Sequence, residues 1–407
     1  MATNNNDKTL NVPPLRFPEF CGEWEKCKFG DIATGFDYGM NAAAKPFDGE
    51  NKYIRITDID EASSTYNDTD IVSPDGSLND NYVVNDRDIL LARTGASTGK
   101  SYLYRKSDGK LYYAGFLIRA NVTEHNPYFV FSQLHTHRYW RWVSIMSARS
   151  GQPGINSQEY SSFPVFTTSL QEENKISTLL SLLDERISTQ NKIIEKYESL
   201  IQAMCDALIE SEQHKVKLSF NDFGEPYSGL LGKSAEDFGE GCPYITYMNV
   251  YQNQIIDTAN VGLVKINETE QQSVVHYGDI LFTLSSETAE EVGMGAVYLG
   301  DTYPLYLNSF CFGIHIIDEN KIFPPFLAFY VSTKSFRKVV FPLAQGSTRF
   351  NLQKNDFMKK VFSFPTVERQ RKIYSSLKTY SDKLSVEKSI VKLLCEQKNH
   401  LLSQLFI

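Results

Sequence analysis

The chain has few cysteines, few histidines and no long apolar run, and each shortage excludes a class of protein. Its 407 residues include six cysteines without a C-x-x-C pair, which excludes a disulfide scaffold and favours free thiols in a reducing compartment. The close histidine pair, His135 and His137, has no cysteine nearby, so we expect no metal site. No stretch approaches the roughly 18 apolar residues of a membrane span, and residues 1–8 lack the features of a signal peptide. We therefore expect a cytoplasmic protein.

Motifs of the common catalytic sites are also missing. The sequence contains no G-x-S-x-G, no H-E-x-x-H and no convincing paired-carboxylate nuclease motif, so we do not expect an enzyme. Residues 94–101 (TGASTGKS) miss the phosphate-binding pattern G-x-x-x-x-G-K-[ST] by one residue, because Thr94 replaces the first glycine. A strand is expected after them, whereas the pattern needs a helix. This segment is therefore interpreted as a polar turn after a buried strand.

What the sequence does contain is an internal duplication. The segment starting at Asp88 (DIL) lies 191 residues before its counterpart at Asp279, and the turn 151–156 (GQPGIN) lies 195 residues before 346–351 (GSTRFN). Each turn is followed by an apolar stretch with a Phe-Pro pair and then by a long helical pattern. A repeat of this length indicates a duplicated domain and not a solenoid.

Two long helices are predicted, one after each copy, because apolar residues recur at alternating steps of four and three. The predicted seam consists of Ile176, Leu180, Leu183, Ile187, Ile194, Tyr197 and Ile201 in the first helix and of Ile373, Leu377, Leu384, Val391 and Leu394 in the second. Each helix has about 40 residues and so a length of about 60 Å. Residues 170–212 are net −5 and residues 367–407 net +4, which favours mutual pairing over a homodimer. An antiparallel pair most simply holds two domains apart.

Each copy is expected to be an α+β domain. The predicted strands are 52–56, 89–93, 102–105 and 112–120 in the first copy, and 244–248, 280–284, 295–299 and 310–317 in the second. A short helix is predicted after Pro127 and after Pro325. The predicted fold class is α+β, with two duplicated domains (1–169 and 213–366) separated by two long helices (170–212 and 367–407) that form an antiparallel coiled coil.

The net charge of −8 argues against a nucleic-acid partner, but the basic residues are unevenly distributed. Residues 87–149 hold ten Lys and Arg against three acidic residues, and residues 321–360 hold eight against one, so both stretches are net +7. Matching basic stretches indicate two polyanion-binding faces, with solvated surface and plain turns as the simpler alternative. The candidate DNA-binding residues, chosen by charge and turn position, are Arg93, Thr94, Ser97, Thr98, Lys100, Arg149, Gln152, Asn156, Arg349, Asn351 and Lys354.

Six short segments, spread along nearly the whole chain, form a recognisable series. They are 15–20 (LRFPEF) followed by Trp24, 88–93 (DILLAR), 151–156 (GQPGIN), 170–176 (LQEENKI), 183–187 (LDERI) and 401–406 (LLSQLF). In their order, spacing and duplication these segments resemble the specificity subunits of type I restriction-modification systems. The helix starts depart from the Glu-Gln pair frequent in that family, with EE at 172–173 and ERQ at 368–370.

The resemblance implies a subunit with two target-recognition domains, each recognising one half of a split sequence in double-stranded DNA. It also implies that the helices set the distance between half-sites and dock two methyltransferase subunits, with motor-nuclease subunits joining the complex. S-adenosylmethionine, ATP and magnesium would bind to those partners, and this chain would be non-catalytic. Two alternatives remain: a self-contained nuclease or methyltransferase, which the missing motifs disfavour, and a coiled-coil scaffold that binds only proteins, without DNA readout.

Overall fold

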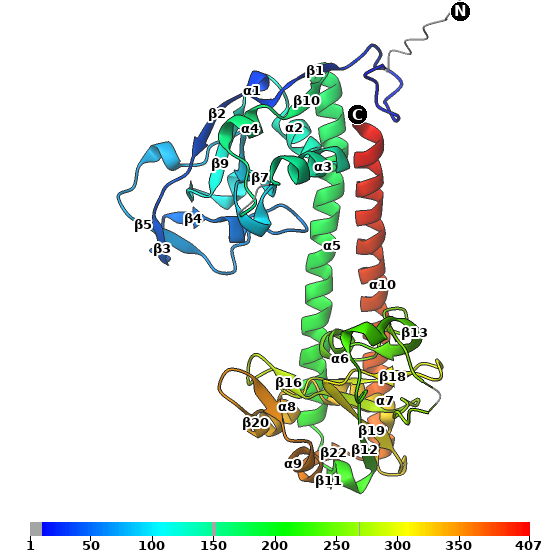
Figure 1. The fold of residues 1–407 in the computed structure, drawn as a ribbon. Helices are drawn as coiled ribbons and strands as arrows, with labels where there is room; N and C mark the ends of the chain where they lie inside the picture. Colours follow the sequence, from blue (N-terminus) through cyan, green and yellow to red (C-terminus); the bar gives the residue numbers. More distant parts are fainter. Residues whose placement is uncertain (1–9, 149–151, 268) are drawn as a thin grey trace, which may run out of the picture. The chain divides into compact units, whose positions relative to one another are not determined.

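The computed structural model describes residues 10–148, 152–267 and 269–407, which form two compact units (Figure 1). Unit 1 comprises Met1–Asn191 with Ser389–Ile407, and unit 2 comprises Lys192–Lys388. Each unit holds one globular copy together with part of both long helices, α5 (Leu170–Glu210) and α10 (Val367–Leu405). Among the described residues, no helix combines the length and apolarity needed to cross a bilayer.

Unit 1 is an α+β domain built on a four-stranded antiparallel sheet with the order β2-β9-β6-β7. Its strands and short helices are β1 (Glu25–Lys28), α1 (Phe29–Ile32), β2 (Ala33–Tyr38), β3 (Ala43–Pro46), β4 (Lys52–Ile54), β5 (Val72–Asp75), β6 (Asp88–Ala92), β7 (Ser101–Leu103), β8 (Leu111–Tyr113), β9 (Leu117–Val122), α2 (Pro127–Gln133), α3 (His137–Met146), α4 (Ser157–Ser161) and β10 (Pro164–Thr167). Strand β6 is buried on both faces, because Ile89 and Leu91 pack towards α2 and α3 while Leu90 packs into a second apolar cluster.

Unit 2 repeats this topology, with a four-stranded sheet in the order β12-β19-β15-β17. Its strands and short helices are β11 (Lys215–Ser219), β12 (Gly224–Ser228), β13 (Phe238–Ile245), α6 (Tyr247–Gln252), β14 (Gly262–Val264), β15 (Ile280–Thr283), β16 (Ser285–Ser286), β17 (Gly295–Val297), β18 (Tyr306–Leu307), β19 (Cys311–Ile316), α7 (Pro324–Tyr330), α8 (Lys334–Val340), β20 (Ala344–Gln345), β21 (Phe350–Leu352), α9 (Lys354–Lys359) and β22 (Val361–Pro365). Ile280 and Phe282 of β15 pack with α7 and α8, and Leu281 packs into a separate cluster. The duplication in the sequence is therefore a duplication of the fold.

In unit 1 the two long helices run antiparallel. Ile176 and Leu180 of α5 share a buried cluster with Leu402 and Leu405 of α10. Asp184, further along α5, forms an ion pair at 2.6 Å with Lys398, which lies earlier in α10. Residue numbers therefore rise along α5 in the direction in which they fall along α10. Each fully buried Leu or Ile contributes about 1.5 to 3 kcal/mol of transfer free energy, so this cluster fixes the pairing.

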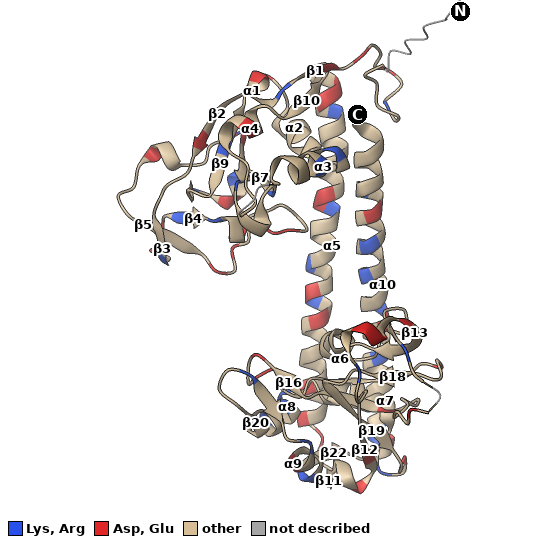
Figure 2. Cartoon of the chain, viewed as in Figure 1, with Lys and Arg blue, Asp and Glu red and all other residues tan. Residues whose placement is uncertain are grey.

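In unit 2 the same antiparallel arrangement holds. Glu198 and Lys388 are 2.7 Å apart, and Glu212, just beyond the end of α5, lies 2.7 Å from Arg369 at the start of α10. Acidic residues predominate in α5 and basic residues in α10, which suits pairs of this kind (Figure 2). All twelve predicted seam residues, seven in α5 and five in α10, are buried or half-buried.

Two predicted strands were wrong by more than two residues. The predicted strand 112–120 is two strands, because the chain turns at Gly115, whose N–H donates to Met40 O at 2.8 Å. Strand β8 then pairs with β4, whereas β9 joins the large sheet. The predicted strand 244–248 ends at residue 245, because Thr246 caps α6 by accepting the backbone N–H of Asn249.

Candidate nucleic-acid interface

Two polar turns that lie far apart in the sequence meet at the end of β6 in unit 1. The turn 94–100 contains the 3-10 helix Gly95–Ser97 and is followed by strand β7, as the sequence predicted. Thr94 forms a bridge with Gly154, and Gly95 N donates to Pro153 O at 3.0 Å. The turn after β6 and the segment before α4 therefore form one surface.

Two buried tyrosines hold this turn from inside the domain. Tyr160 Oη donates to Ala92 O at 2.6 Å, and Tyr139 Oη donates to Gly99 O at 2.8 Å. Both side chains are fully buried. Gly99 has φ +94°, and a Cβ there would lie 2.8 Å from the side chain of Val143, so only glycine fits this close approach. The turn is thus set rigidly above the core.

Arg93 lies at the centre of an aromatic patch. Its guanidinium lies 4.8 Å from the ring centroid of Tyr38 and 5.9 Å from that of Phe116, and its Nε donates to Gly115 O at 3.1 Å. Tyr38 is 43% exposed and Phe116 is 56% exposed. An arginine oriented over exposed rings can contact phosphates, base edges and base faces. The sequence identified Arg93 but missed both aromatic residues; an apolar residue placed in a Gly-containing turn was the available signal for Phe116.

The other candidates of unit 1 divide into surface and internal groups. Thr94 and Ser97 are half-buried on the turn and Gln152 is exposed beside it, whereas Arg149 lies outside the described residues. Thr98 is buried and donates to Gly95 O at 2.8 Å, which stabilises the turn itself. Lys100 lies 3.1 Å from the exposed Glu61 carboxylate, and the Asn156 side chain accepts the N–H of Glu159 as the cap of α4. Thr98 and Asn156 therefore have internal hydrogen-bonding roles.

Unit 2 brings the corresponding segments together through a small sheet. Strand β16, directly after β15, pairs with β21, and Ser285 lies opposite Asn351. Leu352 N also donates to Leu284 O at 2.8 Å. The segment after β6 or β15 and the segment before α4 or α9 are therefore adjacent in both units. In unit 1 the two segments are joined by the bridge between Thr94 and Gly154, and in unit 2 by the three-stranded sheet β16-β21-β20.

Arg349 is exposed and lies over a phenylalanine ring, as Arg93 does. Its guanidinium is 5.5 Å from the ring centroid of Phe310, which is 54% exposed. Asn351 is exposed, with Nδ2 3.5 Å from Arg349 O. Lys354 is half-buried and its Nζ lies 3.3 Å from Ser228 Oγ. All three candidates of unit 2 thus lie on or beside one surface.

The two phenylalanines occupy equivalent places. Phe116 directly precedes β9 and Phe310 directly precedes β19, which are the corresponding strands of the two sheets. The last residues of β2 and β12 are also matched: Tyr38 Oη accepts the N–H of Ser157 at 3.3 Å, whereas Ser228 contacts Lys354. The two surfaces therefore share one framework and differ in chemistry.

Several arginines of the two basic stretches are used inside the protein. Arg87 Nε donates to Val122 O at 2.6 Å, and Arg337 Nη1 donates to Gly293 O at 2.7 Å. Burial lowers the pKa of Arg138 to about 10, and its guanidinium lies 4.6 Å from the ring centroid of Phe166. The net +7 of each stretch therefore overstates the charge available to a polyanion.

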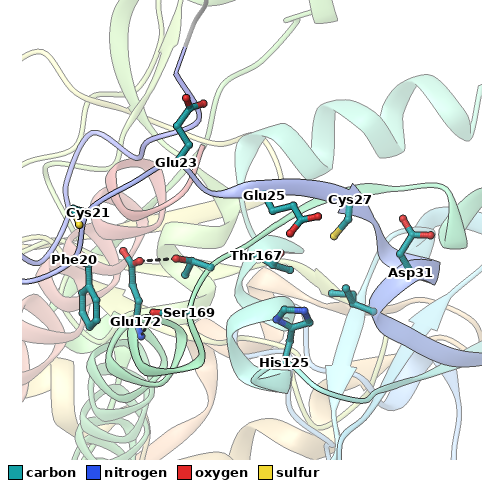
Figure 3. Close-up of a pocket in the computed structure, with 12 residues that line it drawn as sticks. Phe20, Cys21, Glu23, Glu25, Cys27, Asp31, His125, Thr167, Ser169 and Glu172 are labelled. Carbon is teal, nitrogen blue, oxygen red and sulfur yellow. Dashed lines mark hydrogen bonds between the residues drawn. The ribbon is translucent and has the colours of Figure 1, made fainter.

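A pocket elsewhere in unit 1 has the wrong charge for DNA (Figure 3). It is lined by four carboxylates, those of Glu23, Glu25, Asp31 and Glu172, and by no Lys or Arg. Glu172 is paired with Arg16, and the other three carboxylates repel phosphate. The candidate interface therefore consists of the two turn surfaces and not of this pocket.

Comparisons with known proteins agree with this organisation. A family model described as "Type I restriction modification DNA specificity domain" matches residues 22–199 and again 228–394. A solved structure of a type I restriction-modification system S subunit from M. genitalium is 17% identical, with a TM-score of 0.56, and the match covers 97% of this chain and 99% of that one. A chain from a structural study of complex assembly and conformational transition of the type I R-M system is 15% identical, with a TM-score of 0.52 and coverages of 97% and 99%. No curated protein matches this sequence.

Proposed function

We propose a mechanism of DNA recognition from the premise that this chain belongs to the family of type I restriction-modification DNA specificity subunits. Each compact unit recognises one half of a split target in double-stranded DNA, using the surface where its two polar turns meet. Unit 1 contributes Arg93, Thr94, Ser97 and Gln152, and unit 2 contributes Arg349, Asn351 and Lys354.

The observation that carries this proposal is the repeated Arg-Phe surface. In both units an exposed phenylalanine directly precedes the corresponding strand, β9 or β19, and lies beneath an arginine. Arg93 directly follows β6, whereas Arg349 comes from the segment between β20 and β21. A plain solvated turn has no need of such a pair. Arginine is the side chain best suited to bidentate contact with guanine in the major groove and to phosphate.

The differences between the two surfaces support recognition of two different half-sites. Position 38 is a tyrosine under Arg93, whereas its counterpart Ser228 contacts Lys354. Because donors, acceptors and apolar groups differ, the base sequences that fit the two surfaces differ as well.

The long helices serve as the spacer and as the docking site for partners. α5 and α10 set the distance between half-sites, and two methyltransferase subunits dock on them, with motor-nuclease subunits completing the complex. S-adenosylmethionine, ATP and magnesium bind to those partners, and this chain supplies no catalytic group. Partner subunits also supply much of the phosphate neutralisation that a chain of net charge −8 cannot provide alone.

The decisive experiment is a methylation map. The chain is co-expressed with its cognate methyltransferase in a host without DNA methylation, and modified bases are located by long-read sequencing. We expect one motif with two short half-sites and a fixed gap. Assembled complex without new methylation would contradict the proposal.

The scaffold alternative has no support from the comparisons, and DNA binding separates it from the proposal. A chain that binds only proteins would assemble with the methyltransferase equally well with and without Arg93 and Arg349. The proposal requires that the R93A/R349A complex assembles normally and loses sequence-selective, salt-dependent binding to target duplexes.

A further inference from the structure

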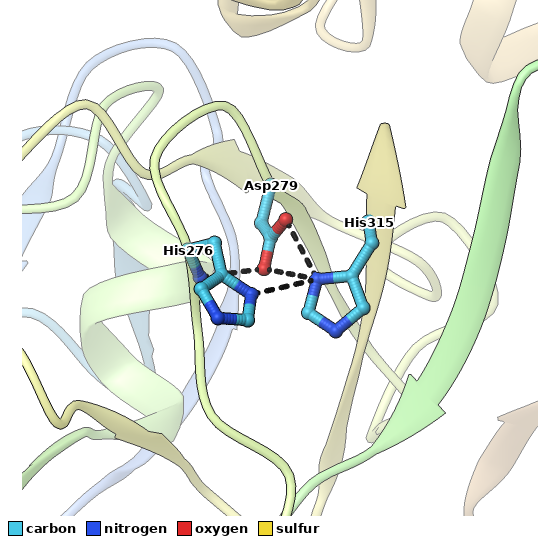
Figure 4. A group of neighbouring side chains, drawn as sticks. All are labelled: His276, Asp279 and His315. Carbon is cyan, nitrogen blue, oxygen red and sulfur yellow. Dashed lines mark hydrogen bonds and ion pairs between the residues drawn. The ribbon is translucent and has the colours of Figure 1, made fainter. Parts of the chain in front are cut away.

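Three side chains with metal-ligating atoms converge at the start of β15 in unit 2 (Figure 4). His276 and Asp279 lie in the turn before β15, and His315 lies on the neighbouring strand β19. One ligand atom from each lies within 4.8 Å of the others. We propose that His276, Asp279 and His315 bind a divalent transition metal ion of the zinc class.

The 3.4 Å between the two imidazole nitrogens matches a tetrahedral site, and the three ligand atoms, which lie within 4.8 Å of one another, would close around the ion. His276 Nδ1 and His315 Nδ1 are 3.4 Å apart, and His315 Nδ1 is 2.9 Å from both carboxylate oxygens of Asp279. Zinc–nitrogen bonds of about 2.0 to 2.1 Å place two ligands of a tetrahedron about 3.3 Å apart. Two imidazoles with one carboxylate favour zinc over calcium or magnesium, which prefer oxygen ligands. Because His276 is exposed, water can complete the coordination.

The side chains are held in position by a second layer of contacts. Tyr227 Oη donates to Asp279 Oδ2 at 2.8 Å, and the Tyr227 ring stacks on His315 with centroids 4.1 Å apart. The backbone N–H of His276 donates to the same Oδ2 at 2.8 Å. Asp279 is 2% exposed, so its carboxylate is fixed, with both oxygens 2.9 Å from His315 Nδ1 (Figure 4). Partners of this kind orient ligands in metal sites.

Unit 1 shows what the same framework does without the imidazoles. Asp88, the counterpart of Asp279, accepts the N–H of Asn85 at 2.7 Å and the Nδ2 of Asn121 at 2.7 Å. A hydrogen bond to the aspartate is therefore enough to explain the polar residue on the neighbouring strand, which is Asn121 in unit 1 and His315 in unit 2. It does not explain His276, because the Asn85 side chain donates away from the aspartate, to Val83 O at 3.0 Å. A metal ion accounts for both histidines.

The bound ion would link the turn before β15 to β19. The same strand β15 leads, at its other end, into β16 and the recognition surface. The ion would therefore stabilise unit 2 without contacting the residues assigned to DNA. This inference does not depend on the proposed function, since it concerns metal affinity alone.

The test is a zinc competition titration of the untagged, metal-stripped full chain against a chromophoric chelator, repeated with cobalt for its visible spectrum. We expect one equivalent of zinc and a tetrahedral cobalt spectrum. The H276N/H315N variant introduces into unit 2 the asparagines that unit 1 has at the matching positions. Its circular dichroism without metal should therefore match that of the original chain, while its zinc affinity should fall at least about tenfold.

The H400N variant is the matched control, because His400 is exposed on α10. It should retain full zinc affinity. Absence of stoichiometric zinc binding, equal binding by H276N/H315N, or an equal loss in H400N would each overturn the metal site. Equal binding would assign the ion to other ligands, such as the exposed thiols of Cys21 and Cys395.

Discussion

Arg16 and Glu172 form a bidentate ion pair in unit 1, in which Nε and Nη2 donate to the two carboxylate oxygens at 2.7 Å each. The counterpart in unit 2 has the charges exchanged. Arg369, the third residue of α10 as Glu172 is of α5, pairs with Glu212 at 2.7 Å. The side chain of Glu172 is 1% exposed, whereas that of Arg369 is 40% exposed.

The different burial predicts different costs of breaking the two pairs. Glu172→Gln removes the buried partner of the half-buried Arg16, and we expect a loss of about 2 kcal/mol in the free energy of unfolding. Glu212→Gln breaks the more exposed of the two pairs, and we expect a loss of at most about 1 kcal/mol. Urea denaturation of both variants checks the difference; equal losses would contradict the role of burial.

The exchanged charges of unit 2 predict that the pair in unit 1 tolerates reversal. Each single variant, Arg16→Glu or Glu172→Arg, places like charges together and should be less stable than Glu172→Gln. The double variant should regain part of the loss but not all, because Arg16 also donates to Cys21 O at 3.1 Å and to Gly22 O. A double-mutant cycle measures the recovery, and strict additivity would refute it.

The same pair predicts sensitivity to acid. Burial opposes ionisation of Glu172, but hydrogen bonds from Arg16 and Thr168 outweigh it, so the pKa of the carboxyl is lowered from its ordinary 4.5. A lowered pKa in the folded state gives stability that is present above the unfolded value and lost as the pH falls through the folded one. The gap between the unfolding free energies of the original chain and Glu172→Gln should therefore shrink below about pH 4.5. A gap that stays constant under acid would argue against this linkage.

The buried tyrosines under the turn of unit 1 predict a link between stability and recognition. Tyr160→Phe removes the donor to Ala92 O and should cost about 1 to 2 kcal/mol. It should also weaken binding to the half-site of unit 1 alone, because the turn loses a support. Tyr303→Phe is the control, since Tyr303 is 70% exposed in unit 2. Denaturation and duplex-binding assays with altered half-sites measure both effects.

Arg93 and Arg349 predict separable effects on the two halves of the target. Arg93→Ala should relax or weaken one half-site and Arg349→Ala the other, each by about 1 to 3 kcal/mol if the contact is to a base. Loss of a phosphate contact would instead weaken binding to all DNA sequences about equally, and it would reduce the slope of log affinity against log salt concentration by about one. Lys217→Ala, at an exposed position of β11, should leave the methylation motif unchanged. A change in both half-sites from one arginine variant would contradict separate recognition.

The fold was largely predictable because its signals are periodic. The 3–4 spacing of apolar residues such as Leu180 and Leu377 predicts a helix when it is sustained over several turns, and the Asp-Ile-Leu repeat at 88 and 279 predicts matching buried strands. The break at Gly115 was missed, because it depends on a hydrogen bond to Met40, 75 positions earlier in the chain. Local pattern alone cannot give contacts of that range.

The site was less predictable because exposure is a property of the folded chain. Phe116 and Tyr38 are aromatic residues of the kind expected in a core, and only the structure shows that they are exposed beside Arg93. Conversely, Arg138 contributes to a basic stretch in the sequence but is used inside the domain. His276 and His315 stand 39 positions apart, too far for any metal motif of fixed short spacing.

The composition of unit 1 from two distant segments determines the order in which the domains can be completed during synthesis. Unit 2 is one uninterrupted segment, 192–388, whereas unit 1 needs residues 389–407, from which Phe406 packs edge-on against Trp24. The domain whose synthesis starts first is therefore finished last. A nascent chain that has reached residue 388 carries every residue of unit 2, yet still exposes the apolar surface around Leu180. During that interval this apolar surface is the part of unit 1 that aggregation would involve.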